Sequence, residues 1–261
     1  MVRSIRNFSK RAFAVGLTQG QKDRMLRVLT PLARDQFDIL AHHYARAPHM
    51  KLGLEKLAAR GFVPKTIVDV GAFEGQWSQM VHEIWPDAAQ VLIEANAEKK
   101  AILKSVADEL DAVLEFALLG PEDGVETTFY VMESGSSVLP ENSPLSREAK
   151  TIPTQRLDTL LNGRGADFLK LDVQGFELEV LNGAPETLKQ ANAVLLEVSL
   201  LEINAGAPIM SDVVAYMKAK GFEVLDILEI HHRPLDKATN QVDLLFAPAV
   251  SPLFSDTRHF A

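Results

Sequence analysis

The sequence contains no cysteine, which excludes disulfide bonds and thiolate metal sites. It also lacks any apolar run of the roughly 18–20 residues that a membrane-spanning helix needs. Its apolar segments are short and strand-like, as at 193–198. The first residues place several cations before only a short apolar stretch, 12–17, which makes a poor secretory signal. These absences favour a soluble protein of a reducing compartment, and we expect a cytoplasmic location.

Positive charge is scarce outside the beginning of the chain. The 261 residues carry a formal net charge of −8. Residues 1–34 hold eight Lys or Arg against one Asp, a charge of about +7, so the remainder carries about −15. Phosphate contacts need a basic face, and none is evident beyond this segment. Nucleic acid is therefore not an expected partner.

The segment 66–78 has the pattern of a ligand cradle. A β-branched apolar strand with Asp69 near its carboxyl end runs into Gly71 and Gly75, and a helix follows. Glycine permits backbone angles closed to other residues and lets a ligand approach the main chain, while the start of the helix offers free N–H groups. The alternative is a glycine turn with a purely structural role.

A second apolar run, 90–94, ends in Glu94, 23 residues after Gly71. In a nucleotide-binding α/β fold, this is where a carboxylate accepts hydrogen bonds from ribose hydroxyls. The spacing Gly71-x-x-x-Gly75 lacks the third glycine of the dinucleotide fingerprint. The pattern therefore favours S-adenosylmethionine over NAD as the cofactor.

The rest of the chain predicts one α/β domain. We expect a doubly wound, Rossmann-like sheet, mostly parallel, with a terminal antiparallel hairpin. After 66–70 and 90–94, the expected strands are 112–119, 126–132 as an extension of the same sheet, 151–155, 168–172, 193–198, 223–230 and 241–247. We assign residues 1–60 to an N-terminal helical extension and 61–261 to the domain. The long segment 134–150 is expected to be a loop that acts as a lid or contacts substrate.

Four ordered motifs carry a family resemblance: 69–78, 135–139, 155–160 and 168–177. Together they resemble the FkbM family of S-adenosylmethionine-dependent methyltransferases, over about residues 63–248. The chain departs from the family at Phe73, where Asn is usual, and at Gln174, where Glu is frequent.

The resemblance and the cradle pattern together assign the cofactor-binding residues. The resemblance implies backbone and apolar contacts to the adenine at Ala117 and Leu118, at the end of the third strand. The cofactor-binding residues are Asp69, Gly71, Ala72, Phe73, Glu74, Gly75, Ser78, Glu94, Ala95, Asn96, Ala117, Leu118, Asp172 and Gln174.

Methyl transfer from a sulfonium requires the protein to position the acceptor and to remove its proton. The candidates for catalysis are Asp172 and Glu197, which end neighbouring strands, and His231, which we expect in the hairpin loop. Two such carboxylates are compatible with Mg²⁺, but carboxylates that bind backbone and cofactor are commoner, so we assign no metal site. A solvent-exposed histidine without function is the alternative for His231.

The resemblance implies O-methylation of a hydroxyl on a sugar, polysaccharide or natural product. N-methylation of a peptide or amide, and a non-catalytic binding module with the same fold, are the alternatives. The acceptor is then a small molecule or a glycan. The basic segment 1–34 has two interpretations: it binds an anionic membrane peripherally, or it docks on the acidic body and stabilises a homo-oligomer.

Overall fold

The structure is a computed structural model that describes residues 47–132, 135–142 and 146–259. Before these ranges it describes only the single residues 21, 24, 28, 36, 39 and 42. The chain divides into two compact units, Met1–His49 and Met50–Ala261. The helices expected before Met50 therefore lie almost entirely outside the described residues. The strands expected from the sequence all fall within the second unit.

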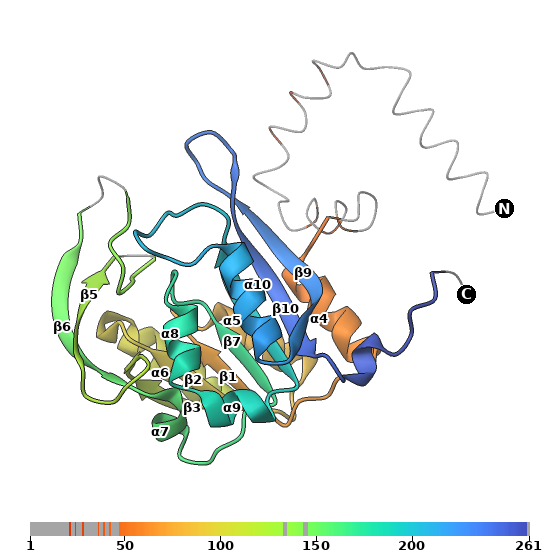
Figure 1. Cartoon of the computed structure of the whole chain (residues 1–261), viewed down its shortest axis with the longest axis horizontal. Coiled ribbons are helices and arrows are strands. Elements are labelled where there is room, and N and C mark those ends of the chain that lie inside the picture. The colour runs from red at the N-terminus through yellow and green to blue at the C-terminus, as the bar shows by residue number, and fades with distance from the viewer. Residues whose placement is uncertain are drawn as a thin grey trace. The chain divides into compact units, whose positions relative to one another are not determined.

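A seven-stranded sheet forms the centre of this unit, with the strand order β3-β2-β1-β7-β8-β10-β9 (Figure 1). Pairs β1–β2, β2–β3, β1–β7 and β7–β8 are parallel, whereas β10 is antiparallel to both β8 and β9. The expected doubly wound sheet with a terminal antiparallel hairpin is confirmed. The strands are β1 (Thr66–Val70), β2 (Ala89–Glu94), β3 (Val113–Phe116), β7 (Phe168–Leu171), β8 (Ala193–Ser199), β9 (Phe222–His232) and β10 (Thr239–Pro248).

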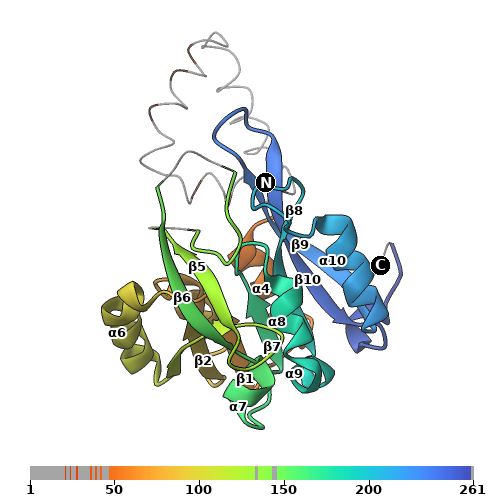
Figure 2. The ribbon, with the colours of Figure 1, turned by 60° about the vertical axis from the view of Figure 1, so that its left-hand side comes forward.

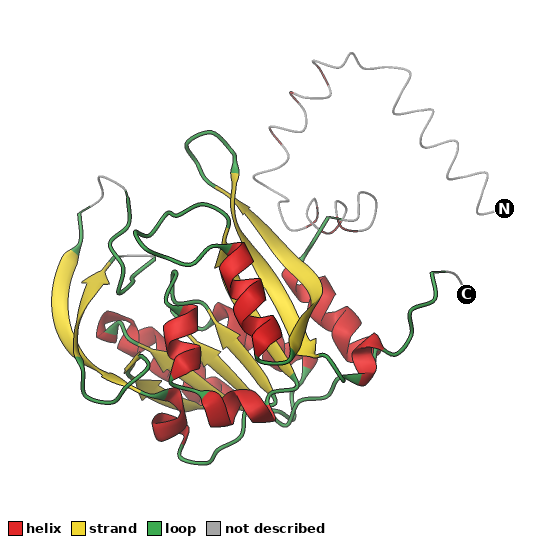
Figure 3. Ribbon diagram, in the orientation of Figure 1, coloured by secondary structure: helices red, strands yellow, loops and turns green. Residues whose placement is uncertain are grey.

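Helices cover both faces of the sheet, as the red ribbons of Figure 3 show. One apolar core joins α4 and α5 to the face that carries Ile67 and Phe168, and the other face packs against α7 to α10. The helices are α4 (Met50–Ala59), α5 (Gln76–Ile84), α6 (Lys100–Leu110), α7 (Leu157–Leu161), α8 (Glu177–Asn182), α9 (Pro185–Gln190) and α10 (Met210–Ala219), with 3₁₀ turns η2 (Ala97–Lys99) and η3 (Pro252–Phe254). Helix α4 packs within this unit, although the predicted domain boundary lies after it.

A second, three-stranded sheet with the order β4-β6-β5 lies beside the large one (Figure 2). It consists of β4 (Leu118–Leu119), β5 (Glu126–Val131) and β6 (Glu148–Gln155). The prediction that 126–132 extends the main sheet is wrong, because β5 pairs antiparallel with β6 of the small sheet and with no strand of the large one. The expected strand 112–119 is likewise divided, since β3 pairs with β2 while β4 pairs with β6.

The terminal hairpin is longer than predicted. Strand β9 continues to His232, so His231 lies in a strand, where it pairs with Gln241 of β10, and not in a loop.

The helices of the described residues include none with the length and apolar character of a membrane span.

Candidate active site

A cavity of about 260 Å³ lies at the carboxyl ends of β2, β1 and β7. The small sheet and the segment 135–138 form its other walls. In open α/β sheets, ligands bind at this edge. The lining residues are Val70, Gly71, Phe73, Ile93, Glu94, Ala95, Asn96, Ala117, Leu118, Leu119, Phe129, Gly135, Ser136, Ser137, Val138, Asp172, Val173, Gln174, Phe176 and Val180.

The turn after β1 brings main chain to the cavity wall. Gly71 has φ +76°, and a Cβ there would lie 2.0 Å from the carbonyl oxygen of Asp172, so only glycine fits. Phe73 also has a positive φ, +52°. Its backbone N–H donates to Glu94 Oε2 at 2.8 Å, while Lys99 Nζ lies 4.0 Å from the centre of its ring. Phe73 thus contributes to the site through its backbone.

Glu94 is the last residue of β2, and both of its carboxylate oxygens accept hydrogen bonds from the backbone. Oε1 accepts from the N–H of Asn96 at 2.8 Å, and Oε2 accepts from Phe73. The residue is 8% exposed, and burial raises the pKa of its carboxyl, although these backbone N–H groups and the charge of Lys170 act in the opposite direction. Each oxygen can accept a second hydrogen bond, and Glu94 lines the cavity, so it can still accept from a ligand there.

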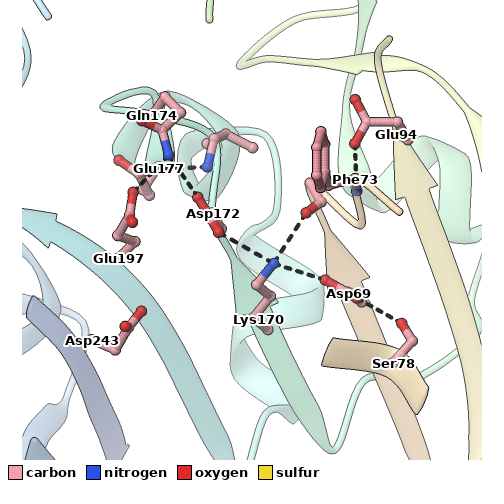
Figure 4. A network of polar contacts seen from close by, with 12 residues as sticks. Asp69, Phe73, Ser78, Glu94, Lys170, Asp172, Gln174, Glu177, Glu197 and Asp243 are labelled. Carbon is pink, nitrogen blue, oxygen red and sulfur yellow. Dashed lines mark hydrogen bonds and ion pairs between the residues drawn. The ribbon is translucent and has the colours of Figure 1, made fainter. Parts of the chain in front are cut away.

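Asp69 and Lys170 lie opposite each other on β1 and β7. The Lys170 ammonium is 3.0 Å from Asp69 Oδ1 and 3.6 Å from Asp172 Oδ2, and it donates to the Gly71 carbonyl at 3.1 Å. The other oxygen of Asp69 accepts from the buried Ser78 hydroxyl at 2.6 Å. Figure 4 shows these contacts, which join the glycine turn to the end of β7.

The polar network continues from Asp172 towards β8 and β10. The side-chain amide nitrogen of Gln174 donates to Asp172 Oδ1 at 3.0 Å and to Glu197 Oε2 at 2.8 Å. Gln241 donates to the same Glu197 oxygen at 2.7 Å. Burial and the neighbouring charges of Asp172 and Asp243 raise the pKa of Glu197. Both partners of the Gln174 side chain are carboxylates, which accept hydrogen bonds, so its amide nitrogen points towards them. The amide oxygen of Gln174 takes no part in these two contacts.

The buried Glu177 side chain accepts hydrogen bonds from the loop between β7 and α8. Its Oε1 accepts from the N–H groups of Val173 at 3.0 Å and Gly175 at 3.2 Å. Burial raises the pKa of Glu177 to about 7. The loop that it holds includes Gln174, whose φ of +56° is unfavourable for a residue with a side chain.

His231 forms a pair with Asp243 on the neighbouring strand. Its Nε2 lies 2.7 Å from Asp243 Oδ2, and this hydrogen bond raises the pKa of the imidazole. Asp243 lies directly opposite Glu197 across β10 and β8. The pair therefore lies next to the network, although neither residue lines the cavity.

The structure brings most of the predicted cofactor residues to one cavity. Those that line it are Gly71, Phe73, Glu94, Ala95, Asn96, Ala117, Leu118, Asp172 and Gln174. The others lie behind its wall or beside it. Ala72 packs in an apolar cluster with Leu92, Glu74 pairs with Lys99 at 2.8 Å, and Gly75 is the N-cap residue that precedes α5. Asp69, Ser78, Glu197 and His231 belong to the polar contacts described above.

Sequence reasoning did not assign a role to Lys170, Gln241 or Asp243. The signal for Lys170 is a cation in the middle of the apolar run 168–171, where only a paired charge can be buried. Gln241 and Asp243 gave no comparable signal, because they lie near the start of a strand whose partners cannot be read from the sequence. Among the described residues, no group of three or more His, Asp or Glu side chains is placed to share a metal ion.

The family model described as "Methyltransferase FkbM domain" matches residues 69–224. The chain therefore belongs to the FkbM methyltransferase family, and its class is that of the S-adenosylmethionine-dependent methyltransferases. The match covers the cradle, the small sheet and the network around Asp172. None of the curated proteins compared with the chain matches it.

Solved structures of several methyltransferases are similar to the chain at low identity. An FkbM methyltransferase from Methylobacillus flagellatus is 16% identical, with 69% of this chain and 43% of that protein covered and a TM-score of 0.45. A precorrin-6y C5,15-methyltransferase from Geobacter metallireducens is 12% identical, with coverages of 75% and 86% and a TM-score of 0.44. Fibrillarin from Aeropyrum pernix, solved with S-adenosyl-L-methionine bound, is 12% identical, with coverages of 70% and 66% and a TM-score of 0.40. The chain thus spans less than half the length of the Methylobacillus protein.

Proposed function

We propose that this protein transfers the methyl group of S-adenosylmethionine to a hydroxyl oxygen of a sugar, a polysaccharide or a natural product. The observation that carries the proposal is the cavity at the sheet edge, which has the Glu94 carboxylate on one side and the Asp172–Gln174 network on the other. One side of the cavity suits a nucleoside, and the other suits an acceptor that must lose a proton.

The residues present fit this cofactor. Because Gly71 has no Cβ, the turn can lie against the Asp172 carbonyl and present its main chain at the cavity wall. The carboxylate oxygens of Glu94 have free lone pairs that suit the two ribose hydroxyls. Ala117 and Leu118 supply an apolar wall for the adenine. When bound, the cofactor supplies an electrophilic methyl carbon on a positively charged sulfur. No metal ion is needed for this assignment of roles.

In the proposed reaction, the acceptor oxygen forms a bond to the methyl carbon while the bond from carbon to sulfur breaks. The electron pair of that bond stays on sulfur, and the hydroxyl proton passes to a base. We assign this proton to the Asp172 carboxylate, because Asp172 lines the cavity and its oxygens keep free lone pairs beside Gln174 and Lys170. Glu197 and His231 do not line the cavity. We assign Glu197 to holding the Gln174 side chain in place. His231 would receive the proton only if the acceptor extends as far as β9.

The experiment that tests this proposal uses S-adenosylmethionine labelled with carbon-13 in the methyl group. The protein is incubated with neutral monosaccharides, nucleotide sugars and short peptides in parallel. We expect a labelled methyl ether, recognised by its carbon-13 chemical shift, in a hydroxyl-bearing acceptor. A label on nitrogen in the peptide set would replace O-methylation by N-methylation.

We further propose that the basic segment 1–34 mediates association of the chain into a homo-oligomer, with peripheral binding to an anionic membrane as the competing proposal. The support is the contrast between this segment and the acidic remainder of the chain. Apart from residues 21, 24 and 28, the segment lies outside the described residues.

A further inference from the structure

Lys170 is a buried cation inside the most apolar strand of the sheet. All four residues of β7 are buried, and the Lys170 side chain is 9% exposed. Its ammonium has three N–H donors, and three oxygens surround it: Asp69 Oδ1 at 3.0 Å, the Gly71 carbonyl at 3.1 Å and Asp172 Oδ2 at 3.6 Å. The protein therefore holds this group by one hydrogen bond to main chain and by ion pairs with two carboxylates.

An aromatic ring borders the ammonium as well. The ring centre of Trp77 on α5 lies 5.8 Å from Lys170 Nζ, and this ring packs edge-on against Phe168. Burial alone would lower the pKa of Lys170, but the charges of Asp69 and Asp172 outweigh it, so the net pKa is raised. Lys170 thus keeps its positive charge and does not act as a base or a nucleophile.

Five carboxylates interact electrostatically with this charge, and two of them, Asp69 and Asp172, form ion pairs with it. Burial raises the pKa of the carboxyls on β2, β8 and β10, and the charge of Lys170 counteracts the rise in each case. The five acids are Asp69 on β1, Glu94 on β2, Asp172 after β7, Glu197 on β8 and Asp243 on β10. Several like charges at one edge repel one another, so a buried cation among them stabilises the whole set.

We propose that Lys170 is a positioning residue of the methyl-transfer site, which fixes the Gly71 carbonyl and the Asp172 carboxylate on the cavity wall and sets the charge of the acids around it. Lys170 does not itself line the cavity. The inference rests on the proposed function, because its main test uses the cofactor and its product.

The charge has a measurable consequence, since S-adenosylmethionine carries a sulfonium and S-adenosylhomocysteine does not. Loss of the Lys170 charge makes the site more negative. It should therefore disfavour the neutral product more than the charged cofactor. A change in packing alone would weaken the binding of both ligands by the same factor.

The experiment measures the dissociation constants of both ligands by titration calorimetry for the parent protein and for Lys170→Met. The matched control is Lys189→Met, which removes an exposed lysine of α9 that pairs only with Glu186. We expect Lys170→Met to bind S-adenosylhomocysteine at least tenfold more weakly and to shift the preference towards S-adenosylmethionine by about tenfold, as expected for one unit charge in partly screened surroundings. The control should match the parent.

A second measurement needs no ligand. In Lys170→Met, the buried carboxylates lose their counter-charge, and their ionised forms become less favourable. The loss of melting temperature should therefore be larger at pH 8 than at pH 5, and the double variant Lys170→Met/Asp69→Asn should recover part of it. If Lys170→Met does not fold at pH 8, its calorimetry is done at the lower pH. The double variant, which restores the net charge of the site, should show no shift of preference between the two ligands.

Equal weakening for both ligands, together with a loss of melting temperature that is independent of pH, would overturn the inference and leave Lys170 with a packing role only. Failure of the proposed function looks different, because the parent protein would then bind neither ligand. In that event, the pH dependence of the melting temperature still decides whether Lys170 sets the charge of the site.

Discussion

Replacement of Glu94 by Gln should weaken cofactor binding without unfolding the protein. The two oxygens of Glu94 accept from Phe73 and Asn96, each at 2.8 Å, and we propose that their free lone pairs accept from the ribose hydroxyls. Glutamine has the same shape but only one acceptor oxygen, so one of the two backbone N–H groups meets an NH₂ group instead. The variant also loses the charge that strengthens the remaining hydrogen bonds.

The size of this effect is set by the hydrogen bond to the ribose that the variant weakens. A hydrogen bond to a charged group contributes about 1.5–3 kcal/mol, and the ribose contact proposed here is of that kind. We therefore expect the dissociation constant for S-adenosylhomocysteine to rise by about ten- to hundredfold in Glu94→Gln. Glu94→Ala should have a larger effect, because it removes both acceptors that we propose for the ribose hydroxyls, whereas glutamine keeps one.

The pH dependence of binding gives an independent check. Burial raises the pKa of Glu94, so its carboxyl takes up a proton at a higher pH than an exposed glutamate does. Affinity for S-adenosylhomocysteine should therefore fall as the pH is lowered, and the fall should be absent in Glu94→Gln. The matched control is Glu98→Gln, which removes an exposed carboxylate that pairs with Lys150. An unchanged affinity in folded Glu94→Gln would refute the ribose assignment.

Three further predictions concern the acids and the basic segment. Asp172→Asn should lower turnover by about 10²–10⁴, the usual range for general-base catalysis, while the protein still binds S-adenosylhomocysteine in calorimetry; full activity would show that Asp172 is structural. Because the folded-state pKa of Glu177 is raised to about 7, its ionised form opposes folding, so the melting temperature of the parent should fall as the pH rises from 5 to 8, and Glu177→Gln should flatten this dependence. A slope equal to that of the parent would contradict this. Deletion of residues 1–20 should convert the oligomer to monomers in light scattering, whereas loss of flotation with anionic liposomes from an intact oligomer would favour the membrane.

The sequence predicted the main sheet well because its strands carry unambiguous local signals. Short apolar runs with an acid at or near their carboxyl ends indicated β1, β2 and β7, and the glycine spacing indicated the turn at Gly71. The small sheet was missed because the exposed and half-buried residues of β5 show only that a strand forms. They do not show whether that strand pairs with β6 or with the main sheet.

The sequence could predict those site residues whose position at the end of one strand is enough to place them. It could not predict contacts that depend on how several strands pair. Glu94 could be found from its position at the end of β2, and Asp172 from its position directly after β7. The contacts of Lys170 require the register of β1 against β7, and those of Gln241 require β10 to insert between β8 and β9. Phe73 shows a different limit, because its contribution comes from a backbone N–H at a positive φ that the side chain does not reveal.

The most direct test of the proposed site is a crystal structure of the protein with S-adenosylhomocysteine. We predict that the ribose hydroxyls lie within hydrogen-bonding distance of the Glu94 carboxylate, the adenine against Ala117 and Leu118, and the sulfur on the side of the cavity formed by Gly71 and Asp172. The product bound elsewhere, or bound in this cavity with its ribose away from Glu94, would contradict the proposed site.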